Sequence, residues 1–255
     1  MKNLPNKKSP FLTLQNVCKR FGGVTASNNI SLELYGGEIF GLIGPNGSGK
    51  TTLLNLITGI YSCDSGDILL EDKKITNYPT HRRAYVGIAR TFQHPRLLGR
   101  CDINTNILIG VDLAEKRKVK DPATFESDMK KYLKAAGLEG INLSDNIEKL
   151  SYGQQKMLEI VRSLLVKPKV LLLDEPAAGV NTKEMEYIVA LINIAVEQNI
   201  AVLLIEHAMD LVMSACDRIT VLNFGQQITT GVPEEVQQNP AVIAAYLGGH
   251  SNAKD

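Results

Sequence analysis

The chain has 255 residues, of which 44% are hydrophobic and 22% charged, a composition typical of a globular protein with a buried core. The formal net charge of +1 argues against a protein that binds duplex DNA, because such domains are usually clearly basic. Apolar runs such as VLLLD and IAVLLIE are far too short to span a bilayer, and the first residues lack the apolar core of a signal peptide. We therefore expect a cytosolic chain with no nucleic-acid partner, which reaches a membrane only through another protein.

The first part of the chain predicts strands that lead into a glycine-rich stretch. Apolar and polar residues alternate there as they do in half-buried strands. The predicted strands lie over 11–21, 29–44 (a pair joined by a turn at Gly36 and Gly37), 65–76 (a short strand and turn) and 85–93 (a strand ending in a polar loop). The second strand of the pair, Ile39 to Ile43, runs directly into the glycine-rich stretch, and helical apolar spacing begins near Lys50.

The segment 95–149 differs from its surroundings. Leu, Ala and Lys recur in it at helical spacing, with little alternation of β-branched residues, which predicts a helical subdomain inserted into the strand-rich core. A glycine-bearing loop at 150–155 follows it. The rest of the chain predicts helices over 154–166, 182–198 and 239–249, strands over 169–176 and 199–206, and a further helix and two short strands between 206 and 239. This alternation predicts a single α/β domain over 1–255 with a largely parallel sheet.

Residues 44–52 carry a phosphate-binding pattern. Gly44, Gly49, Lys50 and Thr51 satisfy GxxxxGK[ST] between a predicted strand and a predicted helix, which is the context that the pattern requires. The glycines let the backbone wrap a phosphate, Lys50 reaches the β- and γ-phosphates, and Thr51 ligates Mg²⁺. The predicted nucleotide-binding residues of this cradle are Gly44, Pro45, Asn46, Gly47, Ser48, Gly49, Lys50, Thr51 and Thr52.

Asp174 and Glu175 end the apolar strand VLLLDE. Ligand sites in open α/β sheets lie at the carboxyl ends of the strands, where this acidic pair would meet the cradle. We expect Asp174 to reach Mg²⁺ through water and Glu175 to accept a proton from an attacking water molecule. A solvated acidic pair without a ligand is the alternative that the strand alone would leave open.

A series of markers then occurs in one order along the chain. They are Phe21 in KRFGG, the cradle, Gln93 in TFQH, LSYGQQ at 150–155, LLLDEP, AAGVN and His207 in IEHAMD. In this order they resemble the ATP-binding subunits of ABC transporters, over nearly the whole chain. The resemblance implies an α/β fold of the P-loop NTPase, ABC type, with a mainly parallel sheet core, an antiparallel β subdomain and the inserted helical subdomain. It also implies an ATPase that uses ATP and Mg²⁺.

The loop at 150–155 is the signature loop of that family. The resemblance implies that Ser151, Gly153 and Gln154 bind the γ-phosphate of ATP held by another subunit, so that two subunits enclose two ATP molecules head to tail. The residues agree, because Ser151 suits the N-cap of the next helix and Gly153 lets a phosphate approach the backbone. Tyr152 departs from the usual LSGGQ pattern. Alone, this loop would be interpreted as an ordinary capped helix.

The resemblance also assigns roles to single residues. Phe21 stacks on adenine, although a core Phe is the alternative. Gln93 contacts Mg²⁺ and the lytic water, His207 hydrogen-bonds the γ-phosphate, and Glu175 is the catalytic base. Asn181 stands where many relatives have Asp in the loop that links the two ATP sites.

Finer features indicate a subfamily. RTFQHPRLL, EPAAGVN and the ending VIAAYLGG are similar to the ATP-binding subunits of bacterial branched-chain amino acid importers. That similarity implies two integral membrane permease subunits and a second ATP-binding subunit, identical or homologous, at the cytoplasmic face of the cell membrane. A periplasmic or extracellular substrate-binding protein would act indirectly.

Other functions remain open from the sequence. The ATPase subunits of lipopolysaccharide export and of urea or amide import share parts of the same pattern. A soluble single-cassette ATPase of an assembly system is a further alternative. A catalytically silent nucleotide-gated module is a third class, but intact Glu175, Gln93 and His207 argue against it.

Overall fold

The computed structural model describes residues 9–110 and 122–247. The strands are β1 (Leu12–Phe21), β2 (Val24–Leu34), β3 (Ile39–Ile43), β4 (Ser65–Leu70), β5 (Lys73–Lys74), β6 (Ile88–Arg90), β7 (Val170–Asp174), β8 (Ala201–Ile205), β9 (Arg218–Asn223) and β10 (Gln226–Gly231). The helices are α1 (Lys50–Thr58), α2 (Thr80–Val86), α3 (Ile103–Leu108), α5 (Pro122–Ala135), α6 (Tyr152–Leu165), α7 (Thr182–Glu197), α8 (Met209–Ala215), α9 (Pro233–Gln237) and α10 (Pro240–Leu247), with a 3-10 turn at Ile147–Lys149.

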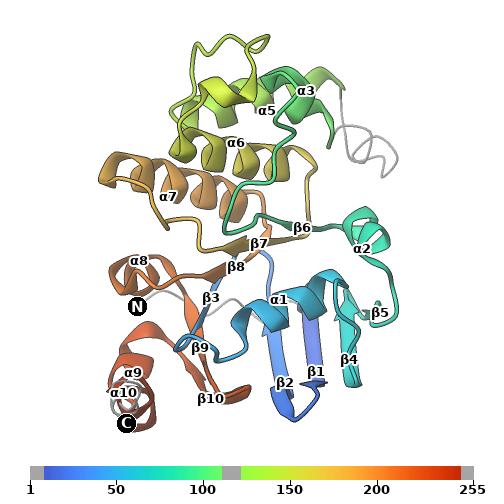
Figure 1. The fold of residues 1–255 in the computed structure, drawn as a ribbon, viewed down its shortest axis with the longest axis vertical. Coiled ribbons are helices and arrows are strands. Elements are labelled where there is room, and N and C mark those ends of the chain that lie inside the picture. The colour runs from blue at the N-terminus through green and yellow to red at the C-terminus, as the bar shows by residue number, and fades with distance from the viewer. Residues whose placement is uncertain (1–8, 111–121, 248–255) are drawn as a thin grey trace.

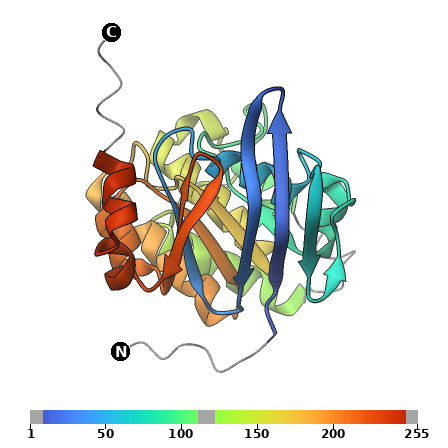
Figure 2. The same cartoon turned by 90° about the horizontal axis from the view of Figure 1, so that it is seen from below.

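Two sheets organise the molecule. The larger has the order β10-β9-β3-β8-β7-β6, in which every neighbouring pair is parallel except β10 with β9. The smaller, β2-β1-β4-β5, is antiparallel throughout. Figure 1 shows α3, α5, α6 and α7 stacked above the larger sheet and the antiparallel sheet below it, and Figure 2 shows the long strands of the antiparallel sheet from below. The predicted fold class is confirmed.

The larger sheet is buried on both faces. Along β7, Leu171 and Leu173 enter the apolar cluster under the helical layer, whereas Val170 and Leu172 enter the cluster shared with α1 and the antiparallel sheet. Successive strand residues point to opposite faces, so a strand covered on both sides needs an unbroken apolar run. This is why VLLLD reads as a parallel strand.

The parallel register brings the motifs to one edge of the sheet. Leu42 of β3 pairs with Ile205 of β8, and Ile205 pairs with Asp174 of β7. The cradle follows β3 and Glu175 follows β7, so both begin at this carboxyl edge. The fold therefore places the cradle beside the acidic pair, as the sequence predicts.

The strand predicted over 85–93 is wrong in its first part. Tyr85 and Val86 belong to α2, and β6 covers only three residues. Gly87, with φ of 121°, ends the helix. Arg83 is buried in α2 and donates to two carbonyl groups at the C-terminal end of α1. This contact with α1 stabilises the helix, and a local sequence pattern does not contain it.

Other boundaries differ in smaller ways. The helix α9 was not predicted, and the predicted helix over 239–249 is observed as α10, whereas Gly248 and Gly249 lie outside the described residues. Within the predicted subdomain 95–149 the structure shows α3, α5 and the 3-10 turn, and residues 111–121 are not described. Its boundaries and the single-domain extent of 1–255 therefore stay predictions.

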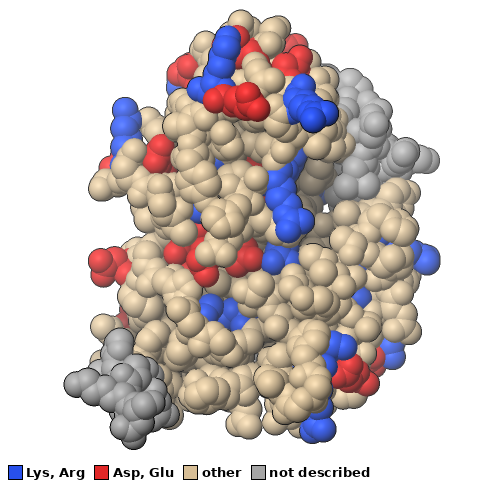
Figure 3. All heavy atoms as spheres, in the orientation of Figure 1, with Lys and Arg blue, Asp and Glu red and all other residues tan. Residues whose placement is uncertain are grey.

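The surface carries both signs of charge. Figure 3 shows Lys and Arg interspersed with Asp and Glu over one face, most of which is formed by other residues. Within 9–110 and 122–247, none of the helices combines the length and the apolar character needed to cross a bilayer.

Candidate functional site

The cradle is the loop between β3 and α1. Its backbone passes so close to its neighbours that two positions require glycine. A Cβ on Gly44 would lie 2.1 Å from the Leu222 carbonyl oxygen, and a Cβ on Gly49 would lie 2.3 Å from the Ala26 carbonyl oxygen. Both glycines also have positive φ angles, of 149° and 106°. The surrounding main chain therefore excludes a side chain at either position.

The first turn of α1 offers donors to an anion. Its N-cap is Gly49, which makes no side-chain hydrogen bond to that turn. Lys50 is buried, and its Nζ donates to the carbonyl oxygens of Gly44 at 2.7 Å and Pro45 at 3.1 Å. Burial lowers the pKa of Lys50, and nearby carboxylates oppose that shift. The ammonium group has three donors, so these two carbonyl partners leave its third N–H for a phosphate oxygen.

The acidic pair at the end of β7 meets the other predicted catalytic residues. Glu175, with φ of 49°, lines the cradle cavity. Its Oε2 accepts from Gln93 Nε2 at 3.0 Å, and its Oε1 lies 3.1 Å from His207 Nε2. Asp174 Oδ2 accepts from Arg90 Nη2 at 2.8 Å in a buried ion pair. The structure thus brings Glu175, Gln93 and His207 together in one cluster beside the cradle.

The predicted metal ligands fit Mg²⁺. The Thr51 hydroxyl, the Gln93 amide oxygen and the Asp174 carboxylate are the oxygen donors that this ion prefers. The bond from Arg90 uses Oδ2 of Asp174, so it does not involve Oδ1. Within the described ranges, no group of three or more His, Cys, Asp or Glu side chains is suited to hold a metal.

The signature loop begins α6 with a capping box. Ser151 Oγ accepts from the Gln154 N–H at 3.2 Å, and Gln154 Oε1 accepts from the Ser151 N–H at 2.9 Å. Gly153 is buried, and a Cβ there would lie 2.0 Å from Glu184 Oε1 on α7. A larger residue here would therefore displace the Glu184 carboxylate, a consequence that the sequence alone does not show.

The cradle and the signature loop line separate cavities. The cradle cavity measures about 330 Å³ and is lined by Val24, Thr25, Ala26, Asn46, Gly47, Ser48, Gly49, Lys50, Thr51, Thr52, Glu175, His207 and Phe224. The signature cavity measures about 360 Å³ and is lined by Ala136, Gly137, Ser151, Gln154, Met157, Asn181, Lys183, Glu184 and Tyr187. The two sets share no residue. Of the predicted cradle residues, Gly44 and Pro45 lie at the start of the loop and do not line its cavity.

Phe21 and Asn181 lie outside the cradle cavity. Phe21 is 43% exposed, which excludes the core alternative, and its ring meets Tyr61 edge-on at 5.1 Å between centroids. Tyr61 is a neighbour that the sequence did not indicate. Asn181 caps α7, where its Oδ1 accepts from the Glu184 N–H at 3.0 Å. It borders the signature cavity with Ser151.

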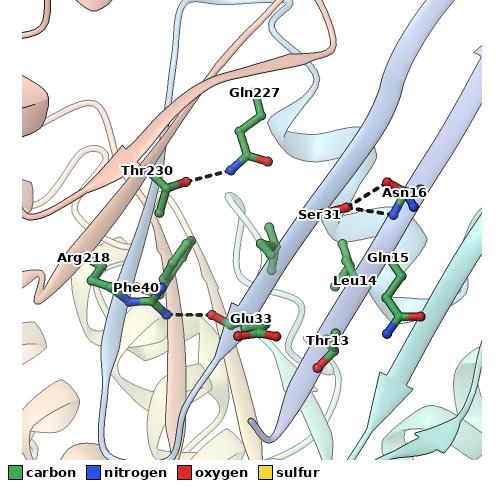
Figure 4. Close-up of a pocket in the computed structure, with 11 residues that line it drawn as sticks. Thr13, Leu14, Gln15, Asn16, Ser31, Glu33, Phe40, Arg218, Gln227 and Thr230 are labelled. Carbon is green, nitrogen blue, oxygen red and sulfur yellow. Dashed lines mark hydrogen bonds between the residues drawn. The ribbon is translucent and has the colours of Figure 1, made fainter. Parts of the chain in front are cut away.

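A larger cavity, of about 480 Å³, lies between β1 and β2 on one side and β9 and β10 on the other. Figure 4 shows that several of its polar lining residues hydrogen-bond to one another. Gln227 Nε2 donates to Thr230 Oγ1 at 2.7 Å, and Arg218 Nη2 donates to the Glu33 carbonyl oxygen at 2.7 Å. None of the motif residues lines it. We therefore place the candidate site at the cradle, not at the larger cavity.

Sequence reasoning missed several residues that support the site. Lys156 is 2% exposed, and its Nζ donates to three carbonyl oxygens of the segment 175–178. Glu206 is 4% exposed and accepts from the Ala177 N–H at 2.6 Å. The sequence signal that could have found Lys156 is its charge at a position that helical spacing places on the apolar side of α6, because a buried charge needs partners. Its partners were not visible, because they lie about 20 residues away in sequence.

Comparisons with known proteins agree with this geometry. The family model described as ABC transporter matches residues 27–178, and that of the branched-chain amino acid ATP-binding cassette transporter matches 226–251. The chain is 42% identical over 252 residues to the high-affinity branched-chain amino acid transport ATP-binding protein LivG of Escherichia coli, covering 94% of this chain and 98% of that protein. It is 40% identical over 257 residues to BraF of Pseudomonas aeruginosa, with the same coverage of both chains.

Two solved structures support the fold. The ADP conformation of MJ1267, an ATP-binding cassette of an ABC transporter, superposes with a TM-score of 0.80 at 32% identity, over 94% of this chain and 100% of that one. A nucleotide-free ATP-binding cassette from an ABC transporter gives the same TM-score and identity, over 93% of this chain and 98% of that one. The chain therefore belongs to the ABC transporter family, among its ATP-binding and ATP-hydrolysing cassette proteins.

Proposed function

We propose that this chain powers the import of branched-chain amino acids. Two relatives that match nearly the full chain are named for that transport, and the family model at 226–251 is described as a branched-chain amino acid ATP-binding cassette transporter. The chain would act at the cytoplasmic face of the cell membrane, on two permease subunits, with a second ATP-binding subunit of identical or homologous sequence. A periplasmic or extracellular substrate-binding protein would deliver the cargo to the permeases.

The separation of the two cavities carries the proposal for how ATP is held. The cradle and the signature loop belong to one nucleotide site in function, yet they share no lining residue within a chain. Two-fold pairing of subunits solves this, because it lays the signature loop of each over the cradle of the other. Ser151, Gly153 and Gln154 of one subunit then complete the site around the other subunit's Lys50.

The cluster beside the cradle supports in-line hydrolysis. Glu175 orients or deprotonates the attacking water, and Gln93 and His207 hold its carboxylate from two sides. In this proposal His207 also hydrogen-bonds the γ-phosphate, and Phe21 stacks on adenine. Thr51, Gln93 and, through water, Asp174 would hold Mg²⁺, which would neutralise charge that develops on the phosphates. ATP binding closes the pair of subunits and switches the permeases, and hydrolysis reopens it.

The test combines partner identification with uptake. A tagged chain should purify from its own membranes together with two integral membrane proteins. Cells that lack the chain should lose uptake of labelled leucine and regain it with the wild-type chain but not with Glu175→Gln, while uptake of labelled urea stays unchanged. Unaltered leucine uptake, or loss of urea uptake instead, would refute the proposed cargo.

A further inference from the structure

Side chains of α6 hold the backbone of the loop that carries Gln93. This loop, 92–96, has no regular secondary structure. Glu159 accepts from the Phe92 N–H at 3.2 Å through Oε2 and from the Arg96 N–H at 2.9 Å through Oε1. Tyr152 donates its hydroxyl proton to the Gln93 carbonyl oxygen at 3.0 Å. Three main-chain groups of the loop are therefore bound by two side chains of one helix.

Arg162 adds a fourth contact. Its Nη2 donates to the Arg96 carbonyl oxygen at 2.8 Å and lies 3.7 Å from Glu159 Oε1. Tyr152, Glu159 and Arg162 are spaced seven and three residues apart, which places them on one side of a helix. The loop thus lies along one stripe of α6.

Glu159 is the most deeply buried of these contacts. Its exposure is 1%, and a carboxylate so far from water persists only with hydrogen-bond partners. Burial raises its pKa, and the two backbone N–H groups oppose that rise. Hydrogen bonds to a carboxylate are stronger than those between neutral groups, so the two ends of the loop are fixed more firmly than its middle.

The middle of the loop connects α6 to the reacting groups. Tyr152 bonds the main chain of Gln93, and the side chain of Gln93 bonds Glu175. Lys156, one turn along α6 from Tyr152, donates to the Glu175 carbonyl oxygen at 2.8 Å. The first turns of α6 therefore hold both Gln93 and Glu175 through the main chain. The Tyr152 hydroxyl also lies 3.3 Å from His94 Nδ1.

We propose that Tyr152 and Glu159 are positioning residues for ATP hydrolysis: they hold the 92–96 backbone on α6 and so set the place of the Gln93 side chain at Glu175. This proposal rests on the proposed roles of Gln93 and Glu175. It gives Tyr152, the residue that departs from the usual signature pattern, a task within its own chain. A displacement of α6 is passed to Gln93 through these contacts.

The first test needs no nucleotide. Hydrogen exchange is compared among wild type, Glu159→Gln and Glu186→Gln, an exposed carboxylate of α7 that serves as the charge-matched control. Amides in 92–96 should exchange about fivefold faster or more in Glu159→Gln, because a glutamine offers one acceptor oxygen instead of two. The cradle amides and the control variant should match wild type. Unchanged hydrogen exchange over 92–96 would contradict the proposal that Glu159 holds this backbone.

The second test asks whether Tyr152 acts through Gln93. In the purified full chain, Tyr152→Phe should lower the kcat for ATP about fivefold, the loss expected for one hydrogen bond, and leave equilibrium ATP affinity within about twofold of wild type. In a Gln93→Ala chain the same substitution should change kcat by less than about twofold. Tyr78→Phe, at a tyrosine beside Arg83 and away from the loop, is the control.

Two results would contradict the proposal. An equal loss of kcat with and without Gln93 would show that Tyr152 acts independently of it. A loss of ATP affinity large enough to account for the slower turnover would show a binding role instead. If leucine uptake proves independent of the chain, the proposed cargo fails while the exchange and kcat results still stand, so the two failures are distinguishable.

Discussion

The helices α1 and α6 both begin beside a predicted phosphate contact, yet their N-termini are built in opposite ways. Gly49 precedes α1 and gives its first turn no side-chain cap. Ser151 precedes α6 and forms a complete capping box with Gln154. The start of α1 therefore depends on an outside group for its hydrogen bonds, whereas the start of α6 is satisfied by its own residues.

This difference indicates which end binds nucleotide first. We call the start of α1 the open end, because no side chain caps it. Together with Lys50, it suits an anion held within one chain. We call the start of α6 the closed end, because the capping box satisfies it. There, Ser151 accepts one hydrogen bond from the Gln154 N–H and keeps its own O–H to donate. A phosphate presented by another subunit can take that proton without breaking the cap. We therefore propose that the cradle is the primary binding site and that the signature loop acts on ATP that is already bound.

The largest expected effect comes from removing the charge at the open end. Lys50→Ala should weaken ATP binding by a lone chain about tenfold to a hundredfold, since it deletes charge-assisted hydrogen bonds to phosphate, and turnover should fall further. Ser151→Arg should leave ATP binding by the dilute chain unchanged and abolish hydrolysis. Equilibrium binding of a fluorescent ATP analogue measures both. Equal losses of ATP affinity in the two variants would contradict the claim that only the start of α1 binds ATP within a lone chain.

Mixing two inactive chains tests whether the ends of α1 and α6 meet across subunits. Ser151→Arg spoils the signature loop and Glu175→Gln spoils hydrolysis at the cradle. In a mixed pair, one site combines an intact Glu175 with an intact Ser151, and the other site has both defects. An equal mixture should recover about a quarter of wild-type activity, because half of the pairs are mixed and each has one of two sites intact. A mixture that stays inactive would contradict the paired arrangement.

The glycines at the two helix starts differ in what surrounds them, because Gly49 meets the main chain of Ala26 and Gly153 meets the side chain of Glu184. Gly153→Ala places a Cβ 2.0 Å from Glu184 Oε1 and disturbs the capping box of α7. Because that carboxylate ends a flexible side chain and can move, the main cost is the weakened cap, and we expect a loss of about 1 kcal/mol in the free energy of unfolding, measured by urea titration. Glu184→Ala in the same chain should restore part of it. Gly99→Ala, where a Cβ meets nothing within 4 Å, is the control and should change stability by less than about 0.5 kcal/mol.

The parts of the molecule that local pattern determines were predictable. The strand Ile39 to Ile43 and the helix start at Lys50 match the structure, because turn glycines and the cradle pattern mark both ends. The helix α2 was missed because YVGIAR has the composition of a strand, and what makes it helical is the contact of Arg83 with α1. Local periodicity does not encode a contact made 26 residues away.

The residues of the candidate site likewise fall into those that the sequence predicted and those that it did not. Family order along the chain predicted Gln93, Glu175 and His207, and the structure places them in contact. It did not predict Arg90 or Lys156, which hold Asp174 and the 175–178 main chain. These residues act on groups from other elements, so their importance appears only after folding. Their roles in hydrolysis, like those of the predicted residues, are proposals that the variants above address.

The smallest effect separates the two tasks of Ser151. Ser151→Ala removes the cap and should lower the free energy of unfolding by about 1 kcal/mol, whereas Ser151→Gly should lower it by only a few tenths, since glycine is tolerated at an N-cap. Both variants lack the hydroxyl that we propose donates to phosphate, so both should lose ATP turnover equally. Asp102→Ala, which uncaps α3 where no nucleotide contact is predicted, should cost similar stability without that loss of turnover. If turnover instead follows stability across the three variants, Ser151 serves only as a cap, and the closed end of α6 has no direct part in holding ATP.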